Sequence, residues 1–403
     1  MRNLILLFTA CLLAACAQPL QPAPTVTVAI PSPSAPPSST TAAPTLALAP
    51  TPTQAPTVAP APLLPAGFVT YDYVGERARL HDLQGALIGE MPVPAPGEVV
   101  HIPARLEPGA TGVPLVYLGR DMRTLTLVAG GEANPVFYAN VLRKLAGASG
   151  EPQIAFSDLQ FASGESITLT SNLYAGDVLA IPGATPMLAY QSAESLSAVP
   201  MAVSPAGIWY AYEPYGIGGD IVFPVYRGLE YLDLASGQVN PVLEPERVPS
   251  ALSPDLSLLA YALNNKGGLV VRQLASGAET TFDLLPSSNR GAGYAVFSPD
   301  NRYVAWIEIS GFQSDPQPAP QGTVRIAETT GKLLAEVPQA AYTDFFGPEP
   351  FAVFPVAFIP LGDGAALLVQ VSSTEESVIL RLSLDGSTLE KLADGRFGGL
   401  VYR

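Results

Sequence analysis

A turn motif that recurs along the second half of the chain constrains the fold more than any other feature. Its copies begin at residues 204, 253, 298 and 359, and the first three read Ser204-Pro205-Ala206, Ser253-Pro254-Asp255 and Ser298-Pro299-Asp300. Each copy separates two segments rich in β-branched and aromatic residues, as expected for a turn between two strands. A fixed unit of short strands, repeated along the chain, is therefore predicted.

A second turn motif follows each copy of the first. It consists of four residues ending in glycine, and it occurs at Leu234–Gly237, Leu274–Gly277, Glu328–Gly331 and Ser383–Gly386, with an earlier copy at Asp82–Gly85. Two turns in a fixed order give four antiparallel strands per repeat. This pattern favours the blades of a β-propeller over a β-sandwich, whose strands need not recur in this way.

The repeats predict an all-β fold, a seven-bladed β-propeller of four-stranded antiparallel blades. The blades are expected to start near residues 66, 98, 151, 199, 248, 292 and 351, with six blades as the alternative. The first half is less regular, and the segment 154–158 is its nearest relic of the turn. The segment 397–402 has no blade of its own, so we expect it to serve as the innermost strand of the first blade and to close the ring.

The turns before aromatic strands resemble those of the TolB-like and WD-repeat-like β-propellers, whose blades carry a Ser-Pro-Asp-Gly turn. The resemblance covers residues 199–403 well and residues 66–198 only weakly. It implies a fold and not a single function, because members of these families bind proteins, bind ligands or accompany a catalytic domain.

The N-terminus has the layout of a bacterial export signal. Arg2 precedes an apolar run from Leu4 to Leu13, and Ala14-Ala15-Cys16 follows. The motif resembles the lipobox of bacterial lipoproteins, which implies a signal peptide at 1–15 and lipidation of Cys16. An ordinary signal peptide that ends near a cysteine is the alternative. We expect an extracytoplasmic protein attached to a bacterial membrane, on the cell surface or the periplasmic side, through its N-terminal lipid.

Residues 16–65 are expected to form a disordered linker and residues 66–403 the propeller. The segment 17–65 contains fourteen prolines and no charged residue, so it cannot build a core. The whole chain has a formal net charge of −15, which makes nucleic acid an unfavourable partner. Cys16 would be the one cysteine of the mature chain, so no internal disulfide is expected. The domain is expected to be monomeric.

The expected working face of the propeller carries its long connections. The insertions 213–228 and 311–322 fall between second and third strands, and 139–150 and 338–350 fall between blades, so all four emerge on one face. The candidate binding residues there are Tyr215, Phe223, Tyr226, Tyr342, Phe345 and Phe346. The alternative is that these rings pack beneath their own loops.

Sequence motifs for catalysis are absent. The chain has no nucleophile elbow, zinc-binding His-Glu-x-x-His, phosphate-binding loop or calcium loop, and its two histidines lie on different blades. We therefore expect no catalytic residues, metal or cofactor. A non-catalytic binding or scaffolding module for a protein, peptide or glycan is favoured. A propeller hydrolase or lyase with residues scattered across blades is the alternative, and a Tol-type role in envelope integrity is a weaker one.

Overall fold

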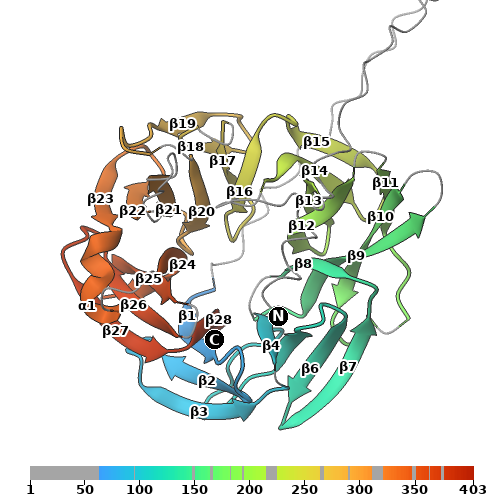
Figure 1. The fold of residues 1–403 in the computed structure, drawn as a ribbon, viewed down its shortest axis with the longest axis horizontal. Coiled ribbons are helices and arrows are strands. Elements are labelled where there is room, and N and C mark those ends of the chain that lie inside the picture. Colours follow the sequence, from blue (N-terminus) through green and yellow to red (C-terminus); the bar gives the residue numbers. More distant parts are fainter. Residues whose placement is uncertain are drawn as a thin grey trace, which may run out of the picture. The chain divides into compact units, whose positions relative to one another are not determined.

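The protein's fold is described by a computed structural model, which covers residues 63–94, 96–147, 150–163, 167–181, 183–192, 195–214, 225–263, 267–288, 291–310, 321–346, 351–362, 364–373 and 376–403. These residues form seven four-stranded antiparallel sheets. The sheets stand around a common centre as the blades of a ring (Figure 1). The prediction of seven blades is confirmed, and the six-bladed alternative is excluded.

Blades are numbered here in chain order, and the strands of each blade are given from the centre outward (Figure 1). Blades 1 to 3 consist of β28 (Arg396–Tyr402), β1 (Pro65–Tyr71), β2 (Arg77–Asp82) and β3 (Leu87–Pro92); β4 (Gly97–His101), β5 (Leu115–Gly119), β6 (Thr124–Ala129) and β7 (Glu132–Tyr138); and β8 (Leu142–Ala146), β9 (Gln153–Ser163), β10 (Ile167–Asp177) and β11 (Leu188–Ser192).

Blades 4 to 7 follow the same plan. They consist of β12 (Leu196–Ser204), β13 (Gly207–Pro214), β14 (Arg227–Asp233) and β15 (Val239–Leu243); β16 (Val248–Leu252), β17 (Leu258–Ala262), β18 (Leu269–Gln273) and β19 (Glu279–Phe282); β20 (Ala292–Phe297), β21 (Tyr303–Ser310), β22 (Gln321–Glu328) and β23 (Leu333–Pro338); and β24 (Ala352–Leu361), β25 (Gly364–Ser372), β26 (Ser377–Ser383) and β27 (Leu389–Asp394). Two short helices, η1 (Gln339–Tyr342) and α1 (Thr343–Phe346), connect blades 6 and 7.

Side-chain hydrogen bonds explain why the Ser-Pro-Asp motif marks the first turn of a blade. The Ser253 hydroxyl donates to the Asp255 carboxylate at 2.7 Å and accepts from the Leu258 backbone N–H at 2.9 Å. Ser298 makes the same pair of bonds one blade later. Both serines are fully buried, so the motif satisfies backbone groups that water cannot reach. These bonds hold the first strand of the blade against the second.

The glycine motif forms the turn between the third and fourth strands, as predicted. Gly237 and Gly277 have φ values of 69° and 73°, in the left-handed region that costs glycine little. A residue with a Cβ would be strained at either position. The glycine therefore ends each motif because the backbone needs that conformation there.

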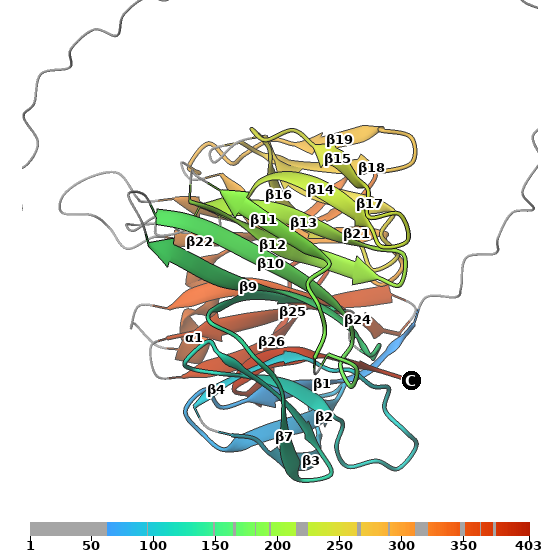
Figure 2. The ribbon, with the colours of Figure 1, turned by 90° about the vertical axis from the view of Figure 1, so that its right-hand side faces the viewer.

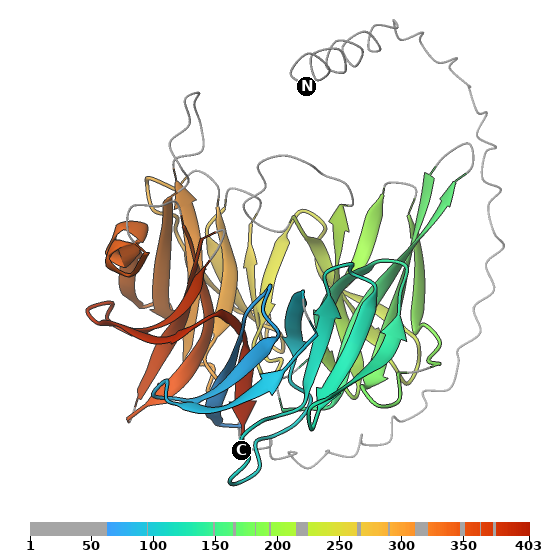
Figure 3. The same ribbon diagram turned by 60° about the horizontal axis from the view of Figure 1, so that its bottom comes forward.

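The last strand closes the ring. β28 pairs antiparallel with β1, from Tyr71 opposite Arg396 to Pro65 opposite Tyr402. The C-terminal strand is therefore the innermost strand of blade 1, as the sequence predicted, and the two ends of the propeller share one sheet (Figure 3). β1 begins at Pro65, one residue before the expected boundary.

Blade 3 differs from the sequence prediction. We expected it to start near residue 151, with 139–150 as an insertion between blades, but Leu142–Ala146 is its innermost strand, β8. The segment 154–158, expected to be a relic of the turn, lies within β9. The Asp158 carboxylate accepts the backbone N–H groups of Asn140 and Val141 at 2.8 and 3.0 Å, and it thereby holds the start of β8 against β9.

The hydrophobic core is divided into seven clusters, each of which joins two neighbouring blades. Both faces of a blade are therefore apolar, and the strand Leu258–Ala262 is buried along its whole length. No blade has a core of its own among the described residues. The side view shows the blades stacked face against face, which is the arrangement that buries these clusters (Figure 2).

Candidate functional site

On one face of the propeller, each blade places the start of its first strand, the end of its second strand and the start of its third strand. We call this face the insertion face. In blade 4, Leu196 of β12 lies opposite Pro214 of β13, and Tyr212 lies opposite Arg227 of β14. The start of the first strand, the end of the second and the start of the third therefore share one edge of the blade. The segments 215–224 and 311–320 follow the second strands of blades 4 and 6 in the chain, and they lie outside the described residues.

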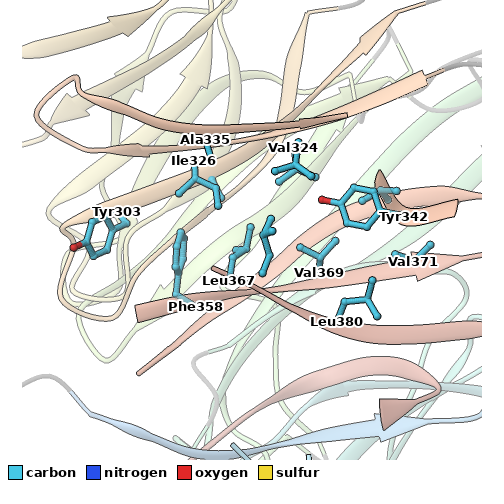
Figure 4. Close-up of a cluster of buried hydrophobic side chains, with 14 of the residues drawn as sticks. Tyr303, Val324, Ile326, Ala335, Tyr342, Phe358, Leu367, Val369, Val371 and Leu380 are labelled. Carbon is cyan, nitrogen blue, oxygen red and sulfur yellow. The ribbon is translucent and has the colours of Figure 1, made fainter. Parts of the chain in front are cut away.

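The aromatic candidates between blades 6 and 7 do not form an exposed patch. Tyr342 is fully buried, and its ring lies among Val324, Val371 and Leu380 in the cluster between these blades (Figure 4). Phe345 and Phe346 are partly buried and pack against the same cluster. Tyr342 therefore packs beneath its own connection, which is the alternative that the sequence analysis left open.

Three of the remaining candidates lie outside the described residues, namely Tyr215, Phe223 and the lipidation residue Cys16. Tyr226 is among the described residues. Tyr226 is only 8% exposed, and its hydroxyl accepts a hydrogen bond from the Lys144 ammonium at 3.1 Å. Lys144 belongs to β8 of blade 3, and Tyr226 precedes β14 of blade 4. Of the candidate aromatics that the structure describes, Tyr226 is the one with a polar partner, and it points to a site that the sequence prediction did not include.

A cavity of about 330 Å³ lies beside Lys144, at the inner ends of blades 1 to 3. Its polar lining residues are Tyr71, Glu98, Arg143 and Lys144, and its apolar wall consists of Val99, Val100, Leu118, Leu125, Leu142, Leu145, Phe156 and Phe397. Cavities that bind small ligands start at about 300 Å³ and combine apolar walls with a few polar groups. This cavity meets both criteria, and it is the candidate functional site.

Lys144 lines the site, and its ammonium lies against residues of blade 4, although part of the residue reaches solvent. Besides Tyr226, it contacts the Met201 sulfur at 3.3 Å, and it lies 4.6 Å from the centre of the Tyr226 ring. Burial lowers the pKa of Lys144 to about 8, and the negative charge of Glu213 acts in the opposite direction. Lys144 therefore remains mostly protonated at neutral pH but gives up its proton more readily than a surface lysine.

Arg143, the neighbour of Lys144, forms an ion pair with Glu213 from the end of β13. Both side chains are partly buried, at 29% and 20% exposure, so the pair joins blades 3 and 4 beside the cavity. The Arg143 charge is thus largely compensated within the protein. Lys144 makes no ion pair with the residues that the structure describes.

Glu98, from β4 of blade 2, is the acidic group of the site. Burial raises the pKa of Glu98, and the positive charge of Arg396 opposes this shift. No hydrogen bond or ion pair joins the Glu98 carboxylate to the residues that the structure describes. The Arg396 guanidinium instead lies over the Tyr73 ring, 4.5 Å from its centre. A half-buried carboxylate without a direct partner is costly and is a common feature of functional sites.

The histidines have structural roles. The His101 ring donates from Nε2 to the Glu151 carbonyl oxygen at 2.8 Å, and burial lowers the pKa of His101 to about 4. His81 stacks on Phe68 and bonds to Thr70 and Gly85, and burial lowers its pKa as well. Among the described residues, no group of three or more His, Cys, Asp or Glu side chains could hold a metal ion. None of the described helices is long and apolar enough to cross a membrane.

Sequence reasoning missed Glu98, Arg143 and Lys144. The repeat register placed 139–150 as an insertion between blades, although Leu142 of this segment is buried in the cluster between blades 2 and 3. Two adjacent cations in a strongly acidic chain were the available signal. Glu98 gave none, because a single carboxylate at the start of a strand is ordinary.

Comparison with known proteins gives structural neighbours but no family. No family model matches the chain. No curated protein sequence matches it. Solved structures that resemble it include TolB from Acinetobacter baumannii, with 12% identity, a TM-score of 0.39, and coverage of 82% of this chain and 80% of that one.

Two further neighbours have similar scores. The putative TolB from Agrobacterium tumefaciens has 13% identity, a TM-score of 0.39, and coverage of 83% of this chain and 90% of that one. The Dos1 propeller has 10% identity, a TM-score of 0.41, and coverage of 82% and 88%. At such low similarity, function has to be argued from the chain's own residues.

Proposed function

We propose that the protein is a membrane-anchored, extracytoplasmic propeller that acts as a non-catalytic binding module for a protein, peptide or glycan. The observation that carries this proposal is the cavity at the inner ends of blades 1 to 3. Its volume of about 330 Å³ suits one chemical unit, such as a chain end, a side chain or a sugar ring, and not a whole polypeptide. A larger partner would therefore insert one such unit and spread over the insertion face.

The location proposed for this module follows from the N-terminal sequence. The Leu13-Ala14-Ala15-Cys16 motif supports lipid attachment, and the proline-rich segment 17–65 supports a long tether. An extended polyproline chain gains about 3.1 Å per residue, which would allow the propeller to work on the order of 100 Å from the membrane. A receptor or scaffold benefits from such reach, because its partner is not confined to the membrane surface.

A propeller hydrolase or lyase is the second candidate, and the titration of the cavity residues favours it. Glu98 has a raised pKa, and Lys144 has a lowered one, which is the pattern of acid and base groups tuned toward neutral pH. Among the described residues, however, the cavity lining includes a single carboxylate. Most glycoside hydrolases use two carboxylates on opposite sides of the scissile bond. Binding therefore ranks first.

Glycan and peptide arrays test the proposal with the full chain. A double variant, Glu98→Gln with Lys144→Met, removes both charges and keeps the side-chain shapes. The control, Glu132→Gln with Lys332→Met, makes the same chemical changes on exposed residues. We expect array ligands that bind wild type and control but not the double variant. Binding that is identical in all three proteins would refute the assigned site. Release of cleaved products from an array ligand would support the enzyme instead.

A further inference from the structure

Two charged residues that line the cavity can each make further hydrogen bonds, Lys144 as a donor and Glu98 as an acceptor. A lysine ammonium has three donors. At Lys144, one donor is directed to the Tyr226 hydroxyl and one to the Met201 sulfur, which is a weak acceptor. No described residue accepts a hydrogen bond from the third donor. Glu213 acts on Lys144 only through its charge. Lys144 lines the cavity, so a ligand acceptor placed beside it would give this third donor a partner.

The blade 2 wall offers the complementary group. An ionised Glu98 is an acceptor only, and its two oxygens have no donor among the described residues. The positive charge of Arg396 acts on Glu98, but this residue packs on Tyr73 and does not line the cavity. A ligand donor placed in the cavity would give the Glu98 carboxylate a direct partner.

The shape of the cavity limits which ligands can use both walls. Glu98 and Lys144 lie on the inner strands of adjacent blades and line the same space of about 330 Å³. Leu125, Phe156 and Phe397 supply apolar surface to the same space. A ligand with a single charge would leave the other wall with a desolvated, unpaired charge, which is unfavourable. The ligand that fits is compact, carries one positive and one negative group, and has a small apolar frame.

We propose that the cavity binds a small zwitterion, either a free amino acid or a short peptide with both ends uncapped, whose ammonium contacts Glu98 and whose carboxylate contacts Lys144. This inference rests on the proposed function, because it names the ligand class of the same site. A peptide partner of the insertion face would be recognised by its chain ends.

The titration behaviour of the two groups agrees with this pairing. An ammonium next to Glu98 would favour the ionised carboxylate and offset the effect of burial. A carboxylate next to Lys144 would favour the protonated amine in the same way. The ligand would thus offset the cost that burial imposes on the two charged groups.

Isothermal titration of the full chain with the dipeptide alanyl-alanine, its N-acetyl derivative and its C-terminal amide tests the proposal. Each cap removes one charge. We expect wild type to bind the uncapped dipeptide about tenfold or more tightly than either derivative, as expected for the loss of one charge-assisted hydrogen bond. Glu98→Gln should abolish the penalty for N-acetylation and keep the penalty for the amide. Lys144→Met should do the reverse.

The exposed variants Glu132→Gln and Lys332→Met serve as matched controls and should retain both penalties. Melting temperatures close to that of wild type would show that the two cavity variants are folded. Equal binding of all three dipeptides, or no binding of the dipeptide and of free alanine, would overturn the inference. If neutral sugars on the array bind in a Glu98-dependent manner, the zwitterion inference fails and the proposed function stands. If no ligand depends on the cavity residues, both fail.

Discussion

Closure of the ring by β28 gives the most direct test of the fold. Removal of residues 397–403 takes away most of the strand that pairs with β1 and two of its buried side chains, Leu400 at 8% and Val401 at 0% exposure. Burial of such side chains is worth about 1.5–3 kcal/mol each, and each ladder hydrogen bond adds about 0.5–1.5 kcal/mol. The summed loss is comparable with the total stability of a typical domain, about 5–15 kcal/mol. The truncated chain should therefore lose its cooperative transition.

A milder change keeps the effect measurable. Val401→Ala removes two methyl-sized groups from a fully buried position and should cost about 2 kcal/mol. Urea titrations followed by tryptophan fluorescence are suitable, because Trp306 is fully buried and changes environment on unfolding. Deletion of residues 17–62 serves as the control and should leave the midpoint unchanged. If the linker deletion and the strand deletion were equally harmful, or if both were harmless, the closure argument would be refuted.

Three further predictions concern a buried ion pair, a histidine and the anchor. Glu308 and Arg325 are 1% and 7% exposed and form an ion pair at 2.7 Å, so Glu308→Leu alone should cost about 3–5 kcal/mol in urea unfolding. Glu308→Leu with Arg325→Met should recover only part of this loss, because the Trp306 indole N–H and the Leu285 backbone N–H also lose the carboxylate that accepts them. The pKa of His101 falls from 6.5 in the unfolded chain to about 4 in the fold, so folding favours the neutral ring. The free energy of unfolding should therefore be highest above about pH 6.5 and should decrease by up to about 3 kcal/mol as the pH falls to about 4. His101→Gln should remove this pH-dependent decrease. Cys16→Ser should abolish metabolic labelling with a fatty acid and release the protein from membranes, and a wild type without label would contradict the proposed anchor.

The fold was predictable where turn chemistry repeats. Ser253 and Ser298 mark first turns because they satisfy buried backbone groups, and the glycine turns require positive φ. Both requirements are local, so they leave a local pattern in the sequence. Blade 3 lacks these motifs, and its inner strand β8 is held by Asp158 from β9 instead. That contact joins residues far apart in the chain, which a turn motif cannot reveal.

The site was less predictable than the fold. Aromatic content in the connection between blades 6 and 7 suggested a binding surface, but Tyr342 completes the cluster between these blades. Whether an aromatic residue packs inward or outward depends on the neighbouring blade and not on its own segment. Tyr226 was singled out for its ring, whereas its hydroxyl, as a partner of Lys144, is what connects it with the cavity. The pairing of Glu98 with Lys144 around one space arises only when three blades meet.

The division of the core into interfaces also affects how such a protein can diverge. The cavity wall takes Leu125 and Phe156 from the cluster between blades 2 and 3, Val99 from the cluster between blades 1 and 2, and Phe397 from the margin of the cluster between blades 7 and 1. In the part of the chain that the structure describes, the interfaces among blades 4, 5 and 6 contribute nothing to this wall. Substitutions that reshape the cavity therefore weaken a limited arc of the ring, while the opposite arc keeps its full packing. Descendants of this sequence could acquire new ligands by mutation of one arc while the other preserves foldability.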